Sequence, residues 1–362
     1  MKYNKKMILE DGSVYEGRSF GADKEVFLEL VFNTSMVGYQ EIISDPSYTD
    51  QAVVMTYPII GNYGINNEDF ETRMPSIGAL IVREYSEEPS NFRCSRTLSD
   101  YMKEVGIVGI RDVDTREITR KIRDIGSCKV LITDIATQED EALSRLNAWD
   151  YAHDQVSRVS ARSVEKRGSG EGLHVVAIDC GMKESIPKSL IERGCRVTTV
   201  PFDTKYEDVV KLNPDGIFVS NGPGDPQDVK ETIELLHQLH GKYPIFGICL
   251  GHQMLSLSYG AKTYKLKFGH RGGNHPVKNL LTDKIEITSQ NHSYAVDAGS
   301  VKGTGLEITH MNLLDDTVEG VRHVEDRAFS VQYHPESAPG PQDSKYLFDH
   351  FCDLMKGGCQ DA

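Results

Sequence analysis

Short apolar runs and amphipathic segments alternate through the second half of the chain, and this alternation restricts the fold more than any other feature. The first of these segments is a buried-type strand, and the last is a strand that turns sharply into a helix. The segments are 173–181, 183–194, 195–202, 215–226, 229–241 and 243–260. Successive parallel strands need helical crossovers, so this order predicts a mostly parallel, helix-covered sheet. The strand-like segments 284–296 and 327–336 are expected to extend that sheet.

The first part of the chain has a different order of elements. Asp11-Gly12 is a hairpin signal between two short strands. Apolar β-rich runs and then helical patterns follow, at 25–34, 51–60, 76–85, 95–105, 114–124 and 138–148. A run of strands followed by helices predicts an α+β fold. We therefore expect an N-terminal α+β domain at 1–151, a polar linker at 152–171 and an α/β domain at 172–362.

Composition limits the partners and the compartment. The 362 residues suffice for two domains, and a formal net charge of -14 disfavours sequence-independent binding to nucleic acid. The seven cysteines include no C-x-x-C pair, so we expect a reducing, cytoplasmic environment and no metal site. The N-terminus has no apolar run of the kind that a secretory signal requires. No stretch is long enough for a membrane span.

The most informative segment is 247–251, with the sequence GICLG, where a short buried strand turns abruptly into a helix. A nucleophile with glycines two residues to either side is typical of hydrolase turns. Cys249 would lie at a helix N-terminus, where the helix dipole favours a thiolate. The N–H of Leu250 lacks an intrahelical partner and can hold a developing oxyanion. A buried structural cysteine is the alternative interpretation.

A second oxyanion donor is expected from the loop 221–225, with the sequence NGPGD, which follows a neighbouring strand. Ligands of open α/β sheets bind at the carboxyl ends of the strands, where this loop would lie. Gly222 and Gly224 leave their backbone amides uncovered, and Pro223 stiffens the loop between them.

His334 is the best candidate for the base among twelve histidines. It ends the apolar strand 328–333, so we expect it at the same sheet edge as Cys249. Glu336 can accept the Nδ1–H and fix the tautomer. His252 lies inside the helix after the turn, and we expect it to point away from the sulfur or only to line the site. A turn with a solvated carboxylate is the alternative, but the three motifs together favour catalysis.

SNGPGDP, GICLGHQ and QYHPE, in this order, resemble the motifs of the class I glutamine amidotransferase domain. The resemblance covers about 173–355. It implies that a cysteine attacks the side-chain amide of glutamine, forms a glutamyl thioester and releases ammonia. Carried over to the matching positions, the resemblance makes Cys249 the nucleophile, His334 the acid/base and Glu336 the residue that orients His334. It assigns the two oxyanion amides to Gly224 and Leu250, and a substrate contact to Gln253.

The segments VFNTSMVGYQEIISDPSYTDQ, TYPIIGNYGIN and DTREITRKIRDIG resemble the N-terminal domain of the carbamoyl-phosphate synthase small chain family. KFGHRGGNHPV and TSQNHSYAV also look like that family. The resemblance implies that Ser47 and the segment 291–294, with Asn291, Ser293 and Tyr294, contact the glutamine backbone. Ser293 departs from the family pattern, which often has glycine there. From the sequence alone, Ser47 is more simply a turn residue.

The resemblance implies that ammonia passes to a large synthase subunit, which combines it with bicarbonate and ATP for arginine synthesis, pyrimidine synthesis or both. We expect no cofactor in this chain, which lacks a G-x-x-x-x-G-K-[ST] loop, and ATP with a divalent cation on the large partner. A higher oligomer of the heterodimer is left open. One alternative, a subunit of another synthase, would need a different N-terminal domain. The other, an inactive regulatory subunit, would be expected to lose Cys249 or His334.

Overall fold

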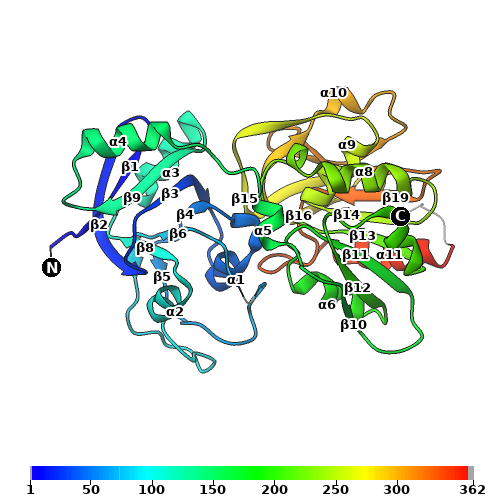
Figure 1. Ribbon diagram of the computed structural model, residues 1–362, viewed down its shortest axis with the longest axis horizontal. Coiled ribbons are helices and arrows are strands. Elements are labelled where there is room, and N and C mark those ends of the chain that lie inside the picture. Colours follow the sequence, from blue (N-terminus) through cyan, green and yellow to red (C-terminus); the bar gives the residue numbers. More distant parts are fainter. Residues whose placement is uncertain (1, 73, 358–362) are drawn as a thin grey trace. The chain divides into compact units, whose positions relative to one another are not determined.

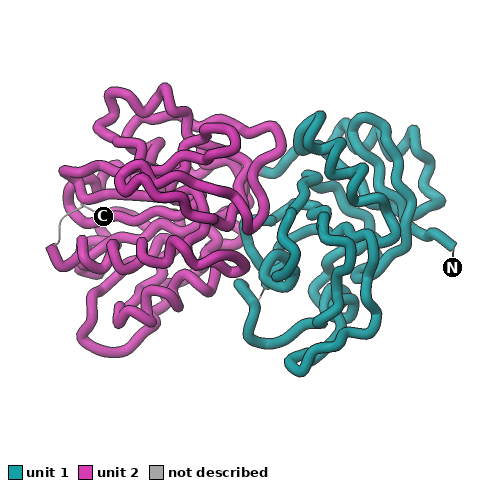
Figure 2. Tube along the Cα trace, turned by 180° about the vertical axis from the view of Figure 1, so that it is seen from behind, with its two compact units in different colours: residues 1–152 teal, residues 153–362 magenta. Residues whose placement is uncertain are grey.

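A computed structural model describes residues 2–72 and 74–357 of the chain (Figure 1). The chain divides into two compact units, Met1–Ala152 and His153–Ala362, coloured separately in Figure 2. Each unit has its own hydrophobic cores. The two units are therefore described one at a time.

The first unit is built on a closed barrel of seven strands in the order β1-β2-β8-β6-β4-β3-β9. The strands are β1 Lys5–Leu9, β2 Val14–Gly21, β3 Val26–Asn33, β4 Gln51–Met55, β6 Ala79–Ile81, β8 Val108–Arg111 and β9 Cys128–Asp134. The predicted hairpin at Asp11-Gly12 joins β1 and β2, and Gly12 has the positive φ that such a turn requires. The pairings from β3 through β4 and β6 to β8 are parallel. Closure leaves the barrel without exposed strand edges.

Helices and short strands surround this barrel, and their bounds are α1 Tyr39–Ser44, η1 Pro46–Tyr48, β5 Ile59–Ile60, β7 Glu84–Tyr85, α2 Leu98–Val105, α3 Thr115–Ile125 and α4 Glu139–Ala148. Helix α3 begins after Asp114, whose side chain accepts a hydrogen bond from the Glu117 N–H. It buries Ile118 and Ile122 at helical spacing, as the sequence predicts, and leaves its charged face outside.

The second unit contains a ten-stranded sheet in the order β10-β12-β11-β13-β14-β19-β18-β16-β15-β17. The strands are β10 Glu165–Arg167, β11 His174–Asp179, β12 Arg196–Pro201, β13 Gly216–Val219, β14 Ile245–Ile248, β15 Thr263–Asn279, β16 Ile285–Val296, β17 Glu307–Asn312, β18 Val318–His323 and β19 Ala328–Val331. Only the pairings from β12 to β19 are parallel. The prediction of a mostly parallel sheet is wrong for the rest, because a long β15–β16 hairpin needs no crossover helix.

Helices cover both faces of this sheet, and their bounds are α5 Gln155–Val159, α6 Ser185–Ile191, α7 Tyr206–Lys211, η2 Pro226–Asp228, α8 Lys230–Leu239, α9 Leu250–Ser258, α10 Ala298–Val301 and α11 Tyr346–Met355. Successive residues of β11 alternate between two cores: Val175 joins one, with α6 and α11, and Val176 joins the other, with α7, α8 and α9. Burial on both faces explains why the central strands read as continuous apolar runs.

The segment 152–171 is not the irregular linker that its polar composition suggests. It contains α5 and β10, and β10 pairs antiparallel with β12 at the end of the sheet. The hydroxyl of Ser160 donates to the Asp179 carbonyl, and the Ala161 N–H donates to the Asp179 carboxylate. Residues 153–171 therefore belong to the second unit. Their polarity reflects an edge strand, whose outer side faces solvent.

No helix in the described part of the chain has the length and hydropathy needed to cross a membrane. The six cysteines within that part are all free. The seventh, Cys359, lies outside the described residues.

Candidate active site

Cys249 lies at the apex of the turn between β14 and α9. It is buried, with 2% of its surface exposed, and its backbone has φ 55 and ψ -104. Positive φ is unfavourable for a residue with a side chain and persists where the surroundings enforce it. Here the Cys249 N–H donates to the Val331 carbonyl of β19, at 2.9 Å. The strand–turn–helix geometry predicted for this cysteine is therefore present.

Glycines make this turn sterically feasible. A Cβ at Gly247 would lie 2.7 Å from the Gly251 carbonyl oxygen, and one at Gly251 would lie 2.3 Å from the Val219 carbonyl oxygen. Both distances are far below van der Waals contact, so neither position can hold a side chain without moving backbone. The two glycines allow α9 to pack against β13 and β14.

His334 and Glu336 form a buried pair directly after β19. The Nδ1 of His334 lies 2.7 Å from Oε1 of Glu336, and both residues are almost completely buried. The Nε2 of His334 is buried without a hydrogen-bond partner among the described residues. Burial alone lowers the pKa of His334, but the Glu336 carboxylate and the neighbouring Cys249 sulfur raise it above its ordinary value. The arrangement therefore favours a protonated His334 ring, whose free Nε2–H is available for proton transfer at Cys249.

Lys183 is a site residue that the sequence analysis missed. Its Nζ lies 3.0 Å from Oε1 of Glu336, and both side chains are buried. Burial alone raises the pKa of Glu336, but Lys183 and then His334 lower it well below its ordinary value. The sequence does hint at this role, because Lys183 lies two residues after the predicted strand 173–181, at the carboxyl end where ligands bind.

The predicted oxyanion residues surround the same end of the sheet. A Cβ at Gly222 would lie 2.2 Å from the Cys180 carbonyl oxygen, and Gly224 has φ 87, so both positions require glycine. Leu250 is the first residue of α9, where N–H groups point out of the helix. The Lys183 N–H donates to Asn221 Oδ1, at 3.1 Å, which ties this loop to the residue that pairs with Glu336.

Strand β16 brings Asn291 to Cys249 and Tyr294 to Gln253. The thiol of Cys249 donates to the Asn291 carbonyl, at 3.5 Å, and Nε2 of Gln253 donates to the Tyr294 carbonyl, at 2.8 Å. The Ser293 hydroxyl accepts from Arg271. Ser293 is not among the residues with positive φ, so serine causes no backbone strain at this position.

Ser47 belongs to the first unit. It lies in η1, after Asp45, whose Oδ1 accepts the Ser47 N–H at 2.9 Å. The predicted turn geometry is present, and Ser47 is 8% exposed. Its assignment to the glutamine site continues to rest on the family resemblance.

His252 does not serve the sulfur. Its Nδ1 lies 2.9 Å from the Ser330 hydroxyl of β19, inside the core. Burial, together with the nearby His310, lowers the pKa of His252 to about 3, so the ring is neutral. The choice of His334 over His252 as the base agrees with this geometry.

A buried polar network behind β16 was also missed by sequence reasoning. Glu319 of β18 accepts hydrogen bonds from Gln290 Nε2 and Asn312 Nδ2, both at 2.9 Å. Oε1 of Gln290 lies 2.9 Å from His292 Nε2, and His292 Nδ1 lies 2.7 Å from the Tyr294 carbonyl. The network therefore connects a fully buried carboxylate to the backbone of the predicted glutamine-binding segment.

His270 supplies positive charge to this network. Its Nε2 lies 2.9 Å from Asp315 Oδ2, and its Nδ1 lies 3.7 Å from Glu319 Oε1. Burial alone lowers the pKa of His270, but the two carboxylates raise it to about 9. Possible metal-ligand atoms of His270, His292 and Glu319 lie within 4.8 Å of one another. A protonated His270 provides the compensating charge that these carboxylates require.

The raised pKa of His270 predicts a pH-dependent stability. The folded state holds this proton up to about pH 9, whereas the unfolded state loses it near the ordinary histidine pKa of about 6.5. The contribution is therefore complete below pH 6.5 and is lost as the pH rises toward 9, by up to about 3 kcal/mol. Urea unfolding at pH 6.5 and pH 9 should show a smaller pH dependence for His270→Gln than for the wild type.

His240→Gln is the matched control, because burial lowers the pKa of His240 to about 4 and the ring stays neutral across this range. Its pH dependence should equal that of the wild type. Equal pH dependence for His270→Gln would show that His270 carries no proton into this range.

Comparison with known proteins agrees with this geometry. Residues 176–354 match the family model "Glutamine amidotransferase class-I", so the second unit is a domain of that class. Residues 7–132 match "Carbamoyl-phosphate synthase small chain, CPSase domain". The carbamoyl phosphate synthase small chain of Fusobacterium nucleatum is 53% identical over 96% of this chain and 97% of its own length. That of Staphylococcus saprophyticus is 52% identical over 96% and 95%.

The chain therefore belongs to the carbamoyl-phosphate synthase small chain family. It is an enzyme subunit of the glutamine amidotransferase type.

Proposed function

We propose that this chain hydrolyses L-glutamine to glutamate and ammonia through a thioester on Cys249. We further propose that it delivers the ammonia to a large synthase subunit that makes carbamoyl phosphate from bicarbonate and ATP. One observation carries the chemistry: Cys249 occupies a strained, buried turn beside the His334–Glu336 pair. Family membership supports the identity of the acceptor. The product serves arginine synthesis, pyrimidine synthesis or both.

In the first step the Cys249 thiolate attacks the amide carbon, and a C–S bond forms while the carbonyl electrons move to oxygen. The thiolate is the reactive form of the nucleophile. The N–H groups of Leu250 and Gly224 hold the oxyanion. The imidazolium of His334 then donates its Nε2 proton to the leaving nitrogen, the C–N bond breaks and ammonia departs.

In the second step water attacks the thioester. His334, now neutral, takes a proton from the water, the C–S bond breaks and glutamate leaves. Glu336 keeps the proton of the neutral ring on Nδ1, so that Nε2 is available at each transfer. Lys183 keeps Glu336 ionised, because an unpaired buried carboxylate would take up a proton itself.

The remaining predicted residues are assigned to glutamine recognition. A free amino acid needs donors for its α-carboxylate and acceptors for its α-ammonium. The side chains and backbone of β16 and α9 supply both kinds of group beside Cys249. The proposed contacts are Ser47, Gly222, Gly224, Leu250, Gln253, Asn291, Ser293 and Tyr294.

The chain needs no metal or organic cofactor for this chemistry, because a thiolate and an imidazole suffice. ATP and a divalent cation are assigned to the large subunit, with which this chain forms a heterodimer or a higher oligomer in the cytoplasm. Nucleic acid and membrane play no part. The alternative of another synthase partner is disfavoured by the match of 7–132 to the small-chain model. The inactive alternative is disfavoured by the presence of Cys249 and His334 at one site.

Transfer of labelled nitrogen tests the proposed partnership. The chain is mixed with the large carbamoyl-phosphate synthase subunit, bicarbonate, ATP and glutamine carrying ¹⁵N in the side-chain amide. Carbamoyl phosphate should carry the label, even when unlabelled ammonium is present in excess. Glutamate release without labelled carbamoyl phosphate would support the glutaminase and contradict the acceptor.

A further inference from the structure

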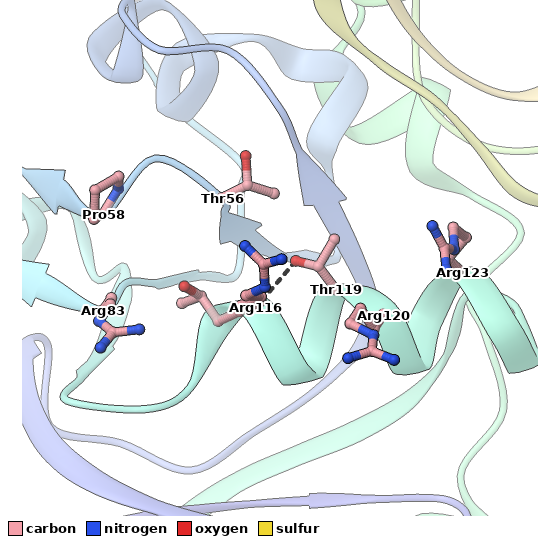
Figure 3. Close-up of a pocket in the computed structure, with 8 residues that line it drawn as sticks. Thr56, Pro58, Arg83, Arg116, Thr119, Arg120 and Arg123 are labelled. Atoms are coloured by element: carbon pink, nitrogen blue, oxygen red, sulfur yellow. Dashed lines mark hydrogen bonds between the residues drawn. The ribbon is translucent and has the colours of Figure 1, made fainter.

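The first unit carries a hollow of about 610 Å³ beside helix α3 (Figure 3). Four arginines line it, together with hydroxyl and proline side chains: Arg83, Arg116, Arg120, Arg123, Thr56, Thr115, Thr119 and Pro58. The whole chain has a formal net charge of -14, so a local cluster of four positive charges runs against its overall balance. The catalytic chemistry uses none of these residues.

These arginines are poorly neutralised within the chain. No ion pair of Arg83, Arg116 or Arg120 is formed with another residue in 2–72 or 74–357. The Nε of Arg123 lies 3.7 Å from Asp124 Oδ1, and both side chains are well exposed. Exposed ion pairs of this kind contribute little stabilising free energy. The hollow therefore presents guanidinium groups that are available to an external anion.

Helix α3 holds three of these arginines in fixed positions. Arg116, Arg120 and Arg123 recur at intervals of four and three residues, which places them on one face. The opposite face buries Ile118 and Ile122 against the barrel. A span of seven residues is about 10 Å along a helix. The positive charge is thus arranged along a rigid line.

The spread of the guanidinium groups distinguishes between possible anions. In Figure 3 the side chains of Arg116, Arg120 and Arg123 leave the helix at separate points and do not converge. A single phosphate would pair with one or two of them and leave the rest unpaired. Carboxylates spaced along a protein segment can pair with each guanidinium in turn, in bidentate geometry.

We propose that this arginine hollow docks an acidic segment of the synthase partner, whose Asp and Glu side chains pair with Arg83, Arg116, Arg120 and Arg123. The inference rests on the proposed function for the identity of the partner. A second copy of this chain fits less well, because two copies with a net charge of -14 each repel one another. Nucleic acid is disfavoured for the same reason.

Charge reversal tests the docking surface. The full-length double variant Arg116→Glu/Arg120→Glu is compared with the wild type for binding to the large carbamoyl-phosphate synthase subunit, by biolayer interferometry at several salt concentrations. The matched control is Lys188→Glu/Lys302→Glu, which makes the same change of charge at exposed positions of the second unit. We expect at least about tenfold weaker binding and a shallower salt dependence for the arginine variant, and neither for the control.

Glutamate release by the chain alone separates this inference from the proposed function. The arginine variant should release glutamate at the wild-type rate, because the substitutions lie outside the catalytic machinery. If the variant unfolds, Arg116→Gln/Arg120→Gln removes the charges without reversing them and should weaken binding in the same direction. Unchanged affinity for the large subunit in a folded variant would overturn the docking proposal and leave the glutaminase intact. The docking proposal would also be overturned if the arginine variant changed only in self-association or in binding of inorganic phosphate, with its affinity for the large subunit unaltered.

Discussion

Replacement of Cys249 by serine is expected to reduce glutamate release from glutamine by at least about a thousandfold. Serine preserves the size and shape of the side chain at this tight turn, but its hydroxyl is not ionised beside a protonated imidazole. The variant has no sulfur, but the Glu336 carboxylate still raises the pKa of His334, so a protonated His334 is poorly suited to remove a proton from serine. Glutamate should be measured with the isolated chain and with the assembled synthase.

Two controls make this prediction specific. Cys94→Ser changes a partly exposed cysteine of the first unit and should leave glutamate release unchanged. The assembled Cys249→Ser enzyme should still make carbamoyl phosphate from added ammonium, because that reaction bypasses the thiol. Loss of both activities would indicate a disrupted assembly. Glutamate release at the wild-type rate by a folded Cys249→Ser variant would contradict the mechanism.

Replacement of Lys183 by methionine is expected to destabilise the fold by about 3–5 kcal/mol. The side chain of methionine fills similar space, but Glu336 loses its buried partner at 3.0 Å. Only His334 then offsets the burial of this carboxylate, so the pKa of Glu336 should rise and its hold on the imidazolium of His334 should weaken. Urea unfolding measures the loss of stability, and kcat for glutamate release should fall with it.

The double variant Lys183→Met/Glu336→Gln provides the control. Removing both charges leaves no unpaired ion, so the double variant should recover much of the stability lost in Lys183→Met. Its activity should remain low, because glutamine is a weaker orienter of His334 than a carboxylate. Strictly additive losses of stability in the two single variants would show that the ion pair is not the source of the effect.

The strands and helices that carry the nucleophile were predictable because local signals agree there. The buried strand before Cys249, the glycines at the turn and the helix after it all indicate one geometry, which the structure contains. The position of His334 followed from topology alone. A residue at the carboxyl end of a parallel strand lies at the same sheet edge as the ends of its neighbours, and β19 is the direct neighbour of β14.

The rest depended on contacts between distant segments. Closure of the first unit requires β3, β4, β6 and β8 to pair in parallel, and no local pattern in these short strands specifies their neighbours. The antiparallel pairing in the other half of the second unit's sheet could not be predicted from the sequence for the same reason. Lys183 and Glu336 form their ion pair although they lie far apart in sequence. Gln290 and Glu319 come into hydrogen-bond distance only when β16 and β18 occupy their positions in the folded sheet. Side-chain identity without spatial context predicts none of these pairs.

Mass spectrometry of the acid-quenched protein during turnover tests the central claim most directly. With glutamine present, the peptide that contains Cys249 should carry a glutamyl group bound through sulfur, and this adduct should disappear when water completes the cycle and glutamine is exhausted. The same experiment with Cys249→Ser should show no adduct. Glutamate formation at the full rate with no acylated Cys249 at any time of quenching, or with the adduct on another residue, would contradict the account.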